Sequence, residues 1–84
     1  MRQITLRDEW NLIKLEKKGF ILNARPEVKR VHHVTCGSVT PTSLDHPKYF
    51  SQNKAASKKW LNDKFGAGKW QNCGYCSGLE SPLG

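Results

Sequence analysis

Hydrophobic residues near the N-terminus recur at the spacing of one face of a helix. Leu6, Trp10 and Ile13 stand at positions i, i+4 and i+7. Two further leucines widen this apolar stripe, namely Leu12 and Leu15. We expect Thr5 to cap the start of the helix and Gly19 to end it, directly after two lysines. The pattern therefore predicts an amphipathic N-terminal helix.

The next hydrophobic runs are too short for helices and predict strands. One run covers residues 20–23 and another covers residues 28–35, with a turn that contains Pro26 between them. Two such runs on either side of a short turn predict an antiparallel hairpin. Residues 37–48 are rich in serine, threonine and proline, so we expect a surface loop there.

A second helix is predicted over residues 51–65, between a cap at Ser51 and a stop at Gly66. Its inward face is expected to carry Ala56, Trp60, Leu61 and Phe65. Residues 69–72 are expected to be extended, and residues 79–84 to form a tail or the start of a linker. Together these elements predict the α+β class, with an N-terminal helix, a short antiparallel hairpin or sheet and a second helix.

The chain has 84 residues, and we expect a single domain over residues 1–78. Only 37% of the residues are hydrophobic, and a domain of this size buries about 60–65% of its unfolded surface. Such a thin core needs a staple, either a disulfide or a metal ion. We find no apolar run of membrane-spanning length and no secretory signal, and therefore expect a cytoplasmic protein without a membrane partner.

The three cysteines favour a metal over disulfides, because an odd number cannot pair within one chain and cytoplasmic thiols stay reduced. Cys73 and Cys76 are separated by two residues and flanked by glycines. In such a tight turn two thiolates converge on one ion, while backbone N–H groups point at the sulfurs. A four-coordinate site needs two more donors, and the other cluster of donors is His32, His33 and Cys36.

Either histidine can complete a site of one histidine and three cysteines, because three residues separate His32 from Cys36 and two separate His33 from it. In a strand the two imidazoles point to opposite faces, so only one of them can be a ligand. Thiolates and imidazole favour Zn²⁺, which is the cofactor we expect. The alternatives are a small core cysteine at position 36 and a later redox pair, which would need a helix beginning at Cys73.

Residues 20–78 contain several motifs in a fixed order. They are Phe20-Ile21-Leu22-Asn23, Lys29-Arg30-Val31-His32 leading to Cys36, Tyr49-Phe50-Ser51 with Ala55-Ala56, and Cys73-x-x-Cys76. In this order they resemble the Ada-type metal-binding domain family. The resemblance implies a zinc-stapled α/β module whose zinc knuckle is C-terminal, and it selects His32 rather than His33 as the fourth ligand. The implied metal ligands are His32, Cys36, Cys73 and Cys76.

The chain departs from the family pattern in three ways. The interval between the two ligand pairs is longer, and Asn72 stands where a proline usually precedes the last pair. In the DNA-repair member of the family the first ligand is a cysteine that accepts a methyl group from a phosphotriester. Because this chain has His32 at that position, the resemblance does not imply the transfer chemistry.

Lysine and arginine number 14 against 7 aspartates and glutamates, and the resulting net charge of +7 favours a polyanionic partner. We expect this partner to be nucleic acid, DNA rather than RNA. The expected phosphate contacts are Arg25, Lys29 and Arg30 on the hairpin and Lys54, Lys58 and Lys59 on the second helix. The family resemblance adds a fused enzyme domain or partner protein, since such modules are often attached to DNA-processing or defence proteins.

Two other function classes compete with nucleic-acid binding. A structural or protein-interaction zinc module would use aromatic anchors such as Trp10, Trp70 and Tyr75. A metal-dependent nuclease would use the pair His32-His33 followed by Asn53, the order of a His-Asn site, but a second metal-binding histidine is missing downstream. We therefore expect a binding module and not an enzyme.

Overall fold

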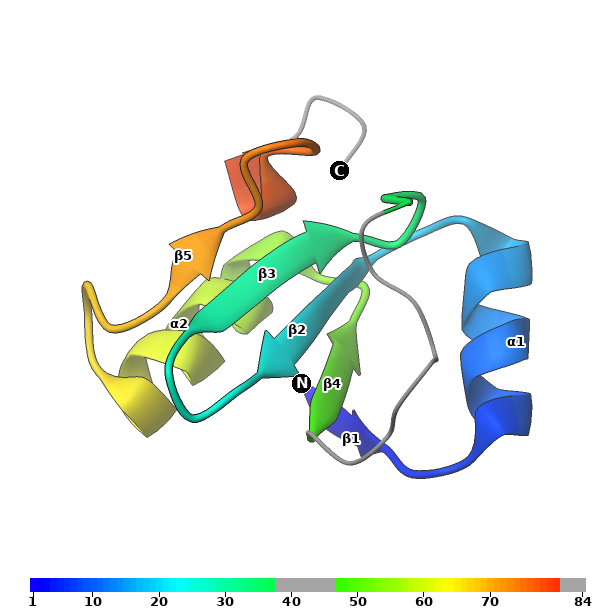
Figure 1. Cartoon of the computed structure of the whole chain (residues 1–84), viewed down its shortest axis with the longest axis horizontal. Helices are drawn as coiled ribbons and strands as arrows, with labels where there is room; N and C mark the ends of the chain where they lie inside the picture. The colour runs from blue at the N-terminus through cyan, green and yellow to red at the C-terminus, as the bar shows by residue number, and fades with distance from the viewer. Residues whose placement is uncertain (38–46, 81–84) are drawn as a thin grey trace.

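The computed structural model describes residues 1–37 and 47–80. Figure 1 shows one sheet with a helix behind it and a second helix at its side, which is the α+β class that the sequence predicts. In chain order the elements are β1 (Arg2–Ile4), α1 (Arg7–Glu16), β2 (Phe20–Ala24), β3 (Lys29–His33), β4 (Lys48–Ser51), α2 (Lys54–Phe65), β5 (Gln71–Asn72) and the short 3-10 helix η1 (Gly78–Glu80). Neither α-helix in this described part has the length and hydrophobicity of a membrane span.

The sheet has five strands in the order β1-β4-β2-β3-β5. β2 lies at its centre and pairs antiparallel with β3, which confirms the predicted hairpin. β2 also pairs antiparallel with β4, and β4 with β1. At the other edge β5 runs parallel to β3, so the extended segment predicted near residue 70 is confirmed at Gln71–Asn72.

The sequence does not predict β1 or β4, because strands of three and four residues are too short to show an alternating pattern. Lys48 belongs to β4 rather than to the loop expected over residues 37–48. Residues 38–46 of that expected loop lie outside the described residues.

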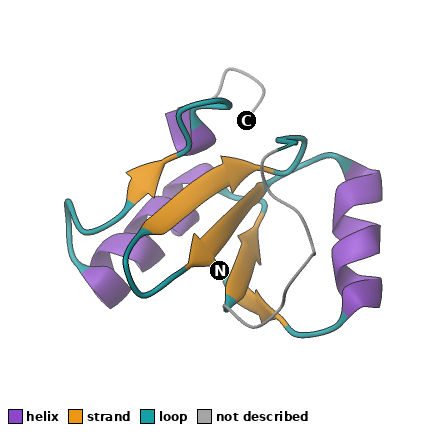
Figure 2. Ribbon diagram, viewed as in Figure 1, coloured by secondary structure: helices purple, strands orange, loops and turns teal. Residues whose placement is uncertain are grey.

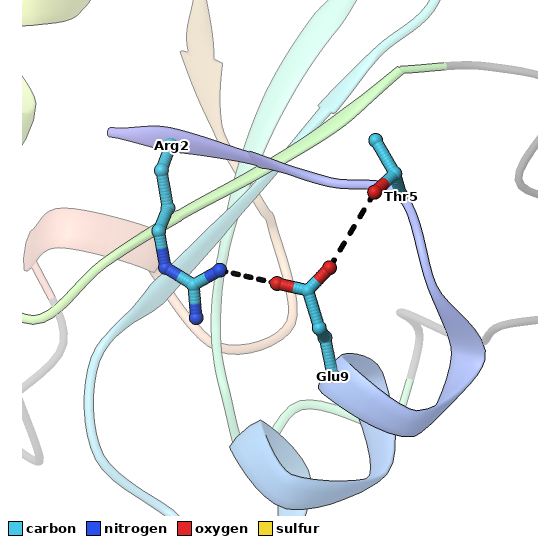
Figure 3. Close-up of polar contacts among 3 residues, drawn as sticks. All are labelled: Arg2, Thr5 and Glu9. Carbon is cyan, nitrogen blue, oxygen red and sulfur yellow. Dashed lines mark hydrogen bonds and ion pairs between the residues drawn. The ribbon is translucent and has the colours of Figure 1, made fainter.

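The first helix begins after Leu6, whose extended backbone precedes it without a side-chain cap. The expected cap, Thr5, instead donates its hydroxyl to the Glu9 carboxylate at 3.5 Å, and Glu9 also forms an ion pair with Arg2 of β1 (Figure 3). The helix ends at Lys17, in the left-handed conformation at φ 58°, two residues before the expected stop at Gly19. The left-handed residue at the C-terminal end of this helix is therefore a lysine and not a glycine.

The inward face of α1 is narrower than the predicted stripe. Trp10 and Ile13 are buried as expected, at 2% and 4% exposure. The other three residues of the stripe are leucines that are exposed by 61–75%, because within the described residues only the side of α1 that carries Trp10 and Ile13 packs into a hydrophobic cluster. They are Leu6, Leu12 and Leu15.

The N-cap of the second helix lies two residues later than predicted. Asn53 is its cap, since the side-chain oxygen accepts the backbone N–H of Ala56 at 2.8 Å. The hydroxyl of Ser51 instead accepts the N–H of Asn53 and donates to the Asn53 carbonyl. Gly66 ends the helix as expected. Of the predicted inward residues Leu61 is buried, Trp60 and Phe65 are half-buried and Ala56 is exposed. Ser57 is buried in the place expected for Ala56.

Two hydrophobic clusters lie on opposite faces of the sheet, because successive side chains of a strand alternate between its faces. Under α2 and η1, which Figure 2 shows behind and above the strands, Leu22, Val31 and Leu61 pack with Leu79. On the other face α1 packs against the central strands and against two of the cysteines. This cluster contains Trp10, Ile13, Ile21, Val34, Phe50, Cys36 and Cys73. The burial of Leu79 places residues 79 and 80 in the fold rather than in the expected tail, whose residues 81–84 lie outside the described part.

Candidate metal centre

The parallel pairing of β3 and β5 brings two distant segments of the chain to one end of the sheet. His32 lies near the end of β3 and Cys36 in the turn after it, while Cys73 and Cys76 lie in the turn after β5. Their four donor atoms all lie within 4.8 Å of one another. The structure thus brings together the four residues that the sequence nominates as ligands, and this cluster can hold a metal ion.

Backbone contacts fix the turn that carries the last two cysteines. The N–H of Cys73 donates to the carbonyl of Val31 at 2.8 Å, and the N–H of Ser77 donates to the carbonyl of Cys73 at 2.9 Å. Gly78 follows at φ 52°, where an added Cβ would lie 2.5 Å from the Val31 carbonyl oxygen. The knuckle is therefore seated directly against β3.

The sulfur atoms have the spacing and the donors that thiolates need. The Sγ atoms of Cys36 and Cys73 lie 3.9 Å apart, close to the separation of about 3.8 Å between two sulfurs of a tetrahedral zinc site with Zn–S bonds of about 2.3 Å. The backbone N–H of Tyr75 donates to Cys73 Sγ at 3.3 Å, and the N–H of His33 donates to Cys76 Sγ at 3.2 Å. Such N–H donors stabilise the charged form of a thiol.

The electrostatic surroundings shift the pKa values of Cys73 and Cys76 in opposite directions. Burial raises the pKa of Cys73, but the backbone N–H groups of Cys76 and Tyr75 together with the neighbouring thiols outweigh burial, so this pKa lies below its ordinary value. The pKa of Cys76 lies above its ordinary value, because burial is the largest cause there. Cys73 is therefore the more easily ionised of the two.

The imidazole of His32 is buried and in its neutral form. Burial, and then the nearby charges of Arg30, Lys14 and Lys48, lower its pKa to about 4. Its Nδ1 atom is buried without a hydrogen-bond partner in the described part of the protein. Because buried polar atoms are nearly always paired, an unpaired ring nitrogen beside three thiols fits a metal ligand.

The neighbouring histidine takes a different role. The His33 ring points to the opposite face of the sheet, where it packs edge-on against Phe20 at 5.8 Å between ring centroids. Its Nδ1 lies 2.8 Å from the hydroxyl of Thr35. The structure therefore brings His32, and not His33, to the three thiols, as the family resemblance implies.

Lys14 is a residue of the centre that sequence analysis misses. Its ammonium group donates to the carbonyl oxygens of Val34 at 2.6 Å and of Cys36 at 3.4 Å, beside the ligand turn. A positive charge at this place offsets the charge of nearby thiolates. No pattern in the sequence distinguishes this lysine from the other lysines of α1.

The six residues expected to contact nucleic acid do not form one surface. Arg25 and Arg30 line a common cavity beside the metal centre. The ammonium of Lys29 lies over the ring of Phe65, 5.7 Å from its centroid, on the face that α2 covers. The remaining three are exposed on α2 itself: Lys54, Lys58 and Lys59.

The residues of the competing hypotheses have structural contacts. Asn53 caps α2, and Trp10 is buried in the core. The indole N–H of Trp70 donates to the side-chain oxygen of Asn62 at 2.9 Å. By contrast, Tyr75 is 91% exposed beside the cysteines, which leaves its ring available to a partner.

Comparisons with protein-family models, with curated proteins and with solved structures gave no match. The function is therefore argued from the site itself.

Proposed function

We propose that the cluster binds one Zn²⁺ and that this ion stabilises the domain. The observation that supports this most is the convergence of His32 with Cys36, Cys73 and Cys76, with their donor atoms within 4.8 Å of one another. Three soft thiolates and one imidazole favour zinc among the common divalent ions. Four protein donors also fill a tetrahedral shell, which is typical of structural rather than catalytic zinc. The proposal is therefore for a binding module and not an enzyme.

The contribution of the ion follows from where the ligands lie. β5 pairs with β3 over only two residues. The cysteine turn and η1 therefore make most of the remaining contacts between the C-terminal segment and the sheet. Because the site does not exist in the unfolded chain, binding of zinc contributes directly to folding, by on the order of 10 kcal/mol for sites of this type. Loss of a metal ligand should therefore lower the stability of the whole domain.

The metal proposal is tested by comparing the mass of the protein under native and denaturing conditions. We expect one zinc ion per chain in the native spectrum, and its loss in Cys36→Ser and Cys73→Ser. Tyr75→Phe is the matched control, because it changes the same turn without removing a donor, and it should keep the ion. A well-folded protein without metal, or a Cys73→Ser variant with a full complement of zinc, would contradict the proposal.

We further propose that the module binds nucleic acid, DNA rather than RNA, through the sheet face that α2 leaves uncovered. The net charge of +7 supports a polyanionic partner. Arg25 and Arg30 line one cavity on this face, and none of its described lining residues is a carboxylate. The exposed lysines of α2 lie on the other side of the sheet and share their surface with Asp63. The arginine face therefore has the more uniform charge, and the proposal retains the resemblance to the Ada-type family.

Nucleic-acid binding is tested by titrating labelled DNA with the protein at two salt concentrations. Affinity should fall by about 0.9 log units per log unit of salt for each duplex phosphate that is neutralised. Complete absence of binding at about 50 mM salt would contradict this part of the proposal. Recovery of a partner protein without nucleic acid would favour a protein-interaction module instead.

A further inference from the structure

A cavity of about 160 Å³ opens beside the metal centre, along the face of β3 that points away from α2. His32 and Cys73 form its inner end, next to the ligand cluster. Asn23 and Arg30, which are paired across β2 and β3, lie on its floor, and Arg25 approaches from the hairpin turn. Val28 and Tyr75 complete the lining.

The cavity has the charge of an anion site. Two arginines line it, and the ammonium of the buried Lys48 donates at 3.2 Å to the side-chain oxygen of Asn23, another lining residue. Arginine is the residue best suited to bind phosphate, because its planar fork donates two parallel hydrogen bonds.

The size of the cavity limits what it can enclose. Pockets that enclose a whole drug-sized ligand have volumes of about 300 Å³ or more. With about 160 Å³ this cavity has room for a phosphate group but not for a complete nucleotide. The rest of a bound nucleotide would therefore lie outside, at the mouth.

Tyr75 is placed to receive that remaining part. Its ring is 91% exposed, although its backbone is held by the hydrogen bond from its N–H to Cys73 Sγ. The turn is itself anchored to the Val31 carbonyl through the N–H of Cys73. An exposed aromatic ring on a fixed turn is a stacking platform for an unpaired base, whereas the bases of a duplex are already stacked on each other.

From this arrangement we infer that the cavity binds one phosphate of a single-stranded nucleic acid through Arg25 and Arg30, while Tyr75 stacks on the adjacent base. The inference rests on the proposed nucleic-acid function and adds that the preferred strand is unpaired.

The test compares a labelled oligothymidylate with a labelled duplex of the same length, using fluorescence anisotropy and the full zinc-loaded chain. The single strand should bind at least about tenfold more tightly than the duplex. Tyr75→Ala should weaken single-strand binding by roughly 5- to 100-fold, the range that loss of one stacked base gives. Tyr75→Phe, which keeps the ring, should bind like the wild type.

A second pair of variants tests the phosphate contact. Arg30→Gln should weaken binding and reduce the salt slope by about 1, since one phosphate contact is lost. Lys58→Gln removes the same charge from α2 on the other side of the sheet and should have little effect. Zinc content and circular dichroism of each variant show that the fold is retained.

The outcomes separate the inference from the function on which it rests. If duplex and single strand bind equally, or if Tyr75→Ala binds like the wild type, the single-strand inference is overturned while nucleic-acid binding stands. If neither nucleic acid binds to the zinc-loaded protein, both are overturned. If Lys58→Gln has the larger effect, the contact surface is α2 and not the cavity.

Discussion

At the scale of single residues, His32 and His33 are identical side chains that lie in different surroundings on the two faces of one strand. One is buried among three thiols with an unpaired ring nitrogen, and the other packs against Phe20 and contacts Thr35. The alternation of strand side chains between the two faces is sufficient to produce this difference.

We predict that His32→Ala abolishes zinc binding and leaves the chain largely unfolded, because one of four ligands is lost. His33→Ala should keep one zinc per chain, although loss of its buried ring should lower the free energy of unfolding by on the order of 2 kcal/mol. Native mass spectrometry and denaturant melts in the presence of zinc measure both effects. Loss of zinc from the His33 variant alone would show that the ligand is misassigned.

Gly78 provides a second residue-level prediction. Its φ of 52° and the Val31 carbonyl oxygen 2.5 Å from an added Cβ leave no room for a side chain. Gly78→Ala should therefore destabilise the domain by about 1–3 kcal/mol. Gly74→Ala in the same turn should be nearly neutral, since no atom of the described residues lies within 4 Å of its added Cβ. Thermal melts of the two variants distinguish a crowded position from an open one, and equal losses would contradict this account.

At the scale of secondary-structure elements, the two α-helices begin in different ways. Asn53 accepts an N–H of the first turn of α2, whereas α1 begins at Leu6 without a side-chain cap. We predict that Asn53→Ala lowers the free energy of unfolding by about 1 kcal/mol, as loss of an N-cap usually does. Thr5→Ala should cost less than about 0.5 kcal/mol, because its hydroxyl reaches only the exposed Glu9 carboxylate. Urea denaturation of the two variants measures the difference, and a larger loss for the Thr5 variant would contradict the cap assignment.

The contribution of η1 gives the second prediction at this scale. Leu79 is 1% exposed and packs with Leu22, Val31 and Leu61 on the α2 side of the sheet. Leu79→Ala should therefore cost about 2–5 kcal/mol, the range for a buried leucine. A change within about 0.5 kcal/mol, measured by denaturant unfolding, would show that the C-terminal segment is dispensable.

The sequence predicts the elements that have strong local patterns and misses those that do not. The hairpin, both helices and the three cysteine donors follow from periodicity, turn residues and spacing, whereas only the family resemblance selects His32 over His33. β1 and β4 are too short for a pattern, and the burial of Leu79 depends on contacts with strands far away in the chain. The exposure of Leu12 and Leu15 likewise depends on where α1 packs, which no local pattern contains.

At the scale of the whole molecule, the metal centre joins two segments that are far apart in the chain. Cys36 and Cys73 belong to the hydrophobic cluster on the α1 side. The turn that contains Cys73 leads into η1, whose Leu79 belongs to the cluster on the α2 side. Disturbance of the centre should therefore affect both faces of the sheet together.

We predict that the protein unfolds with a chelator and with acid. Chelation removes the folding contribution of the ion. Acid acts in the same direction, because the pKa of His32 falls from 6.5 to about 4 on folding, so the unfolded chain binds the proton more readily. The stability that depends on the neutral imidazole is complete above pH 6.5 and is lost as the pH falls toward 4. Circular dichroism with a colorimetric zinc assay follows unfolding and release together; a fold unchanged by chelator at neutral pH would contradict the prediction.

The separation of 37 positions between Cys36 and Cys73 has an evolutionary consequence. The entropy needed to close a loop grows only with the logarithm of its length, so ten added residues would cost about 0.2 kcal/mol. Lineages can therefore add residues to the loops of this interval at little cost, provided that β4, α2 and the short spacings within each ligand pair are kept. Distant kin of this chain should be sought by those two short spacings, with the distance between them left unconstrained.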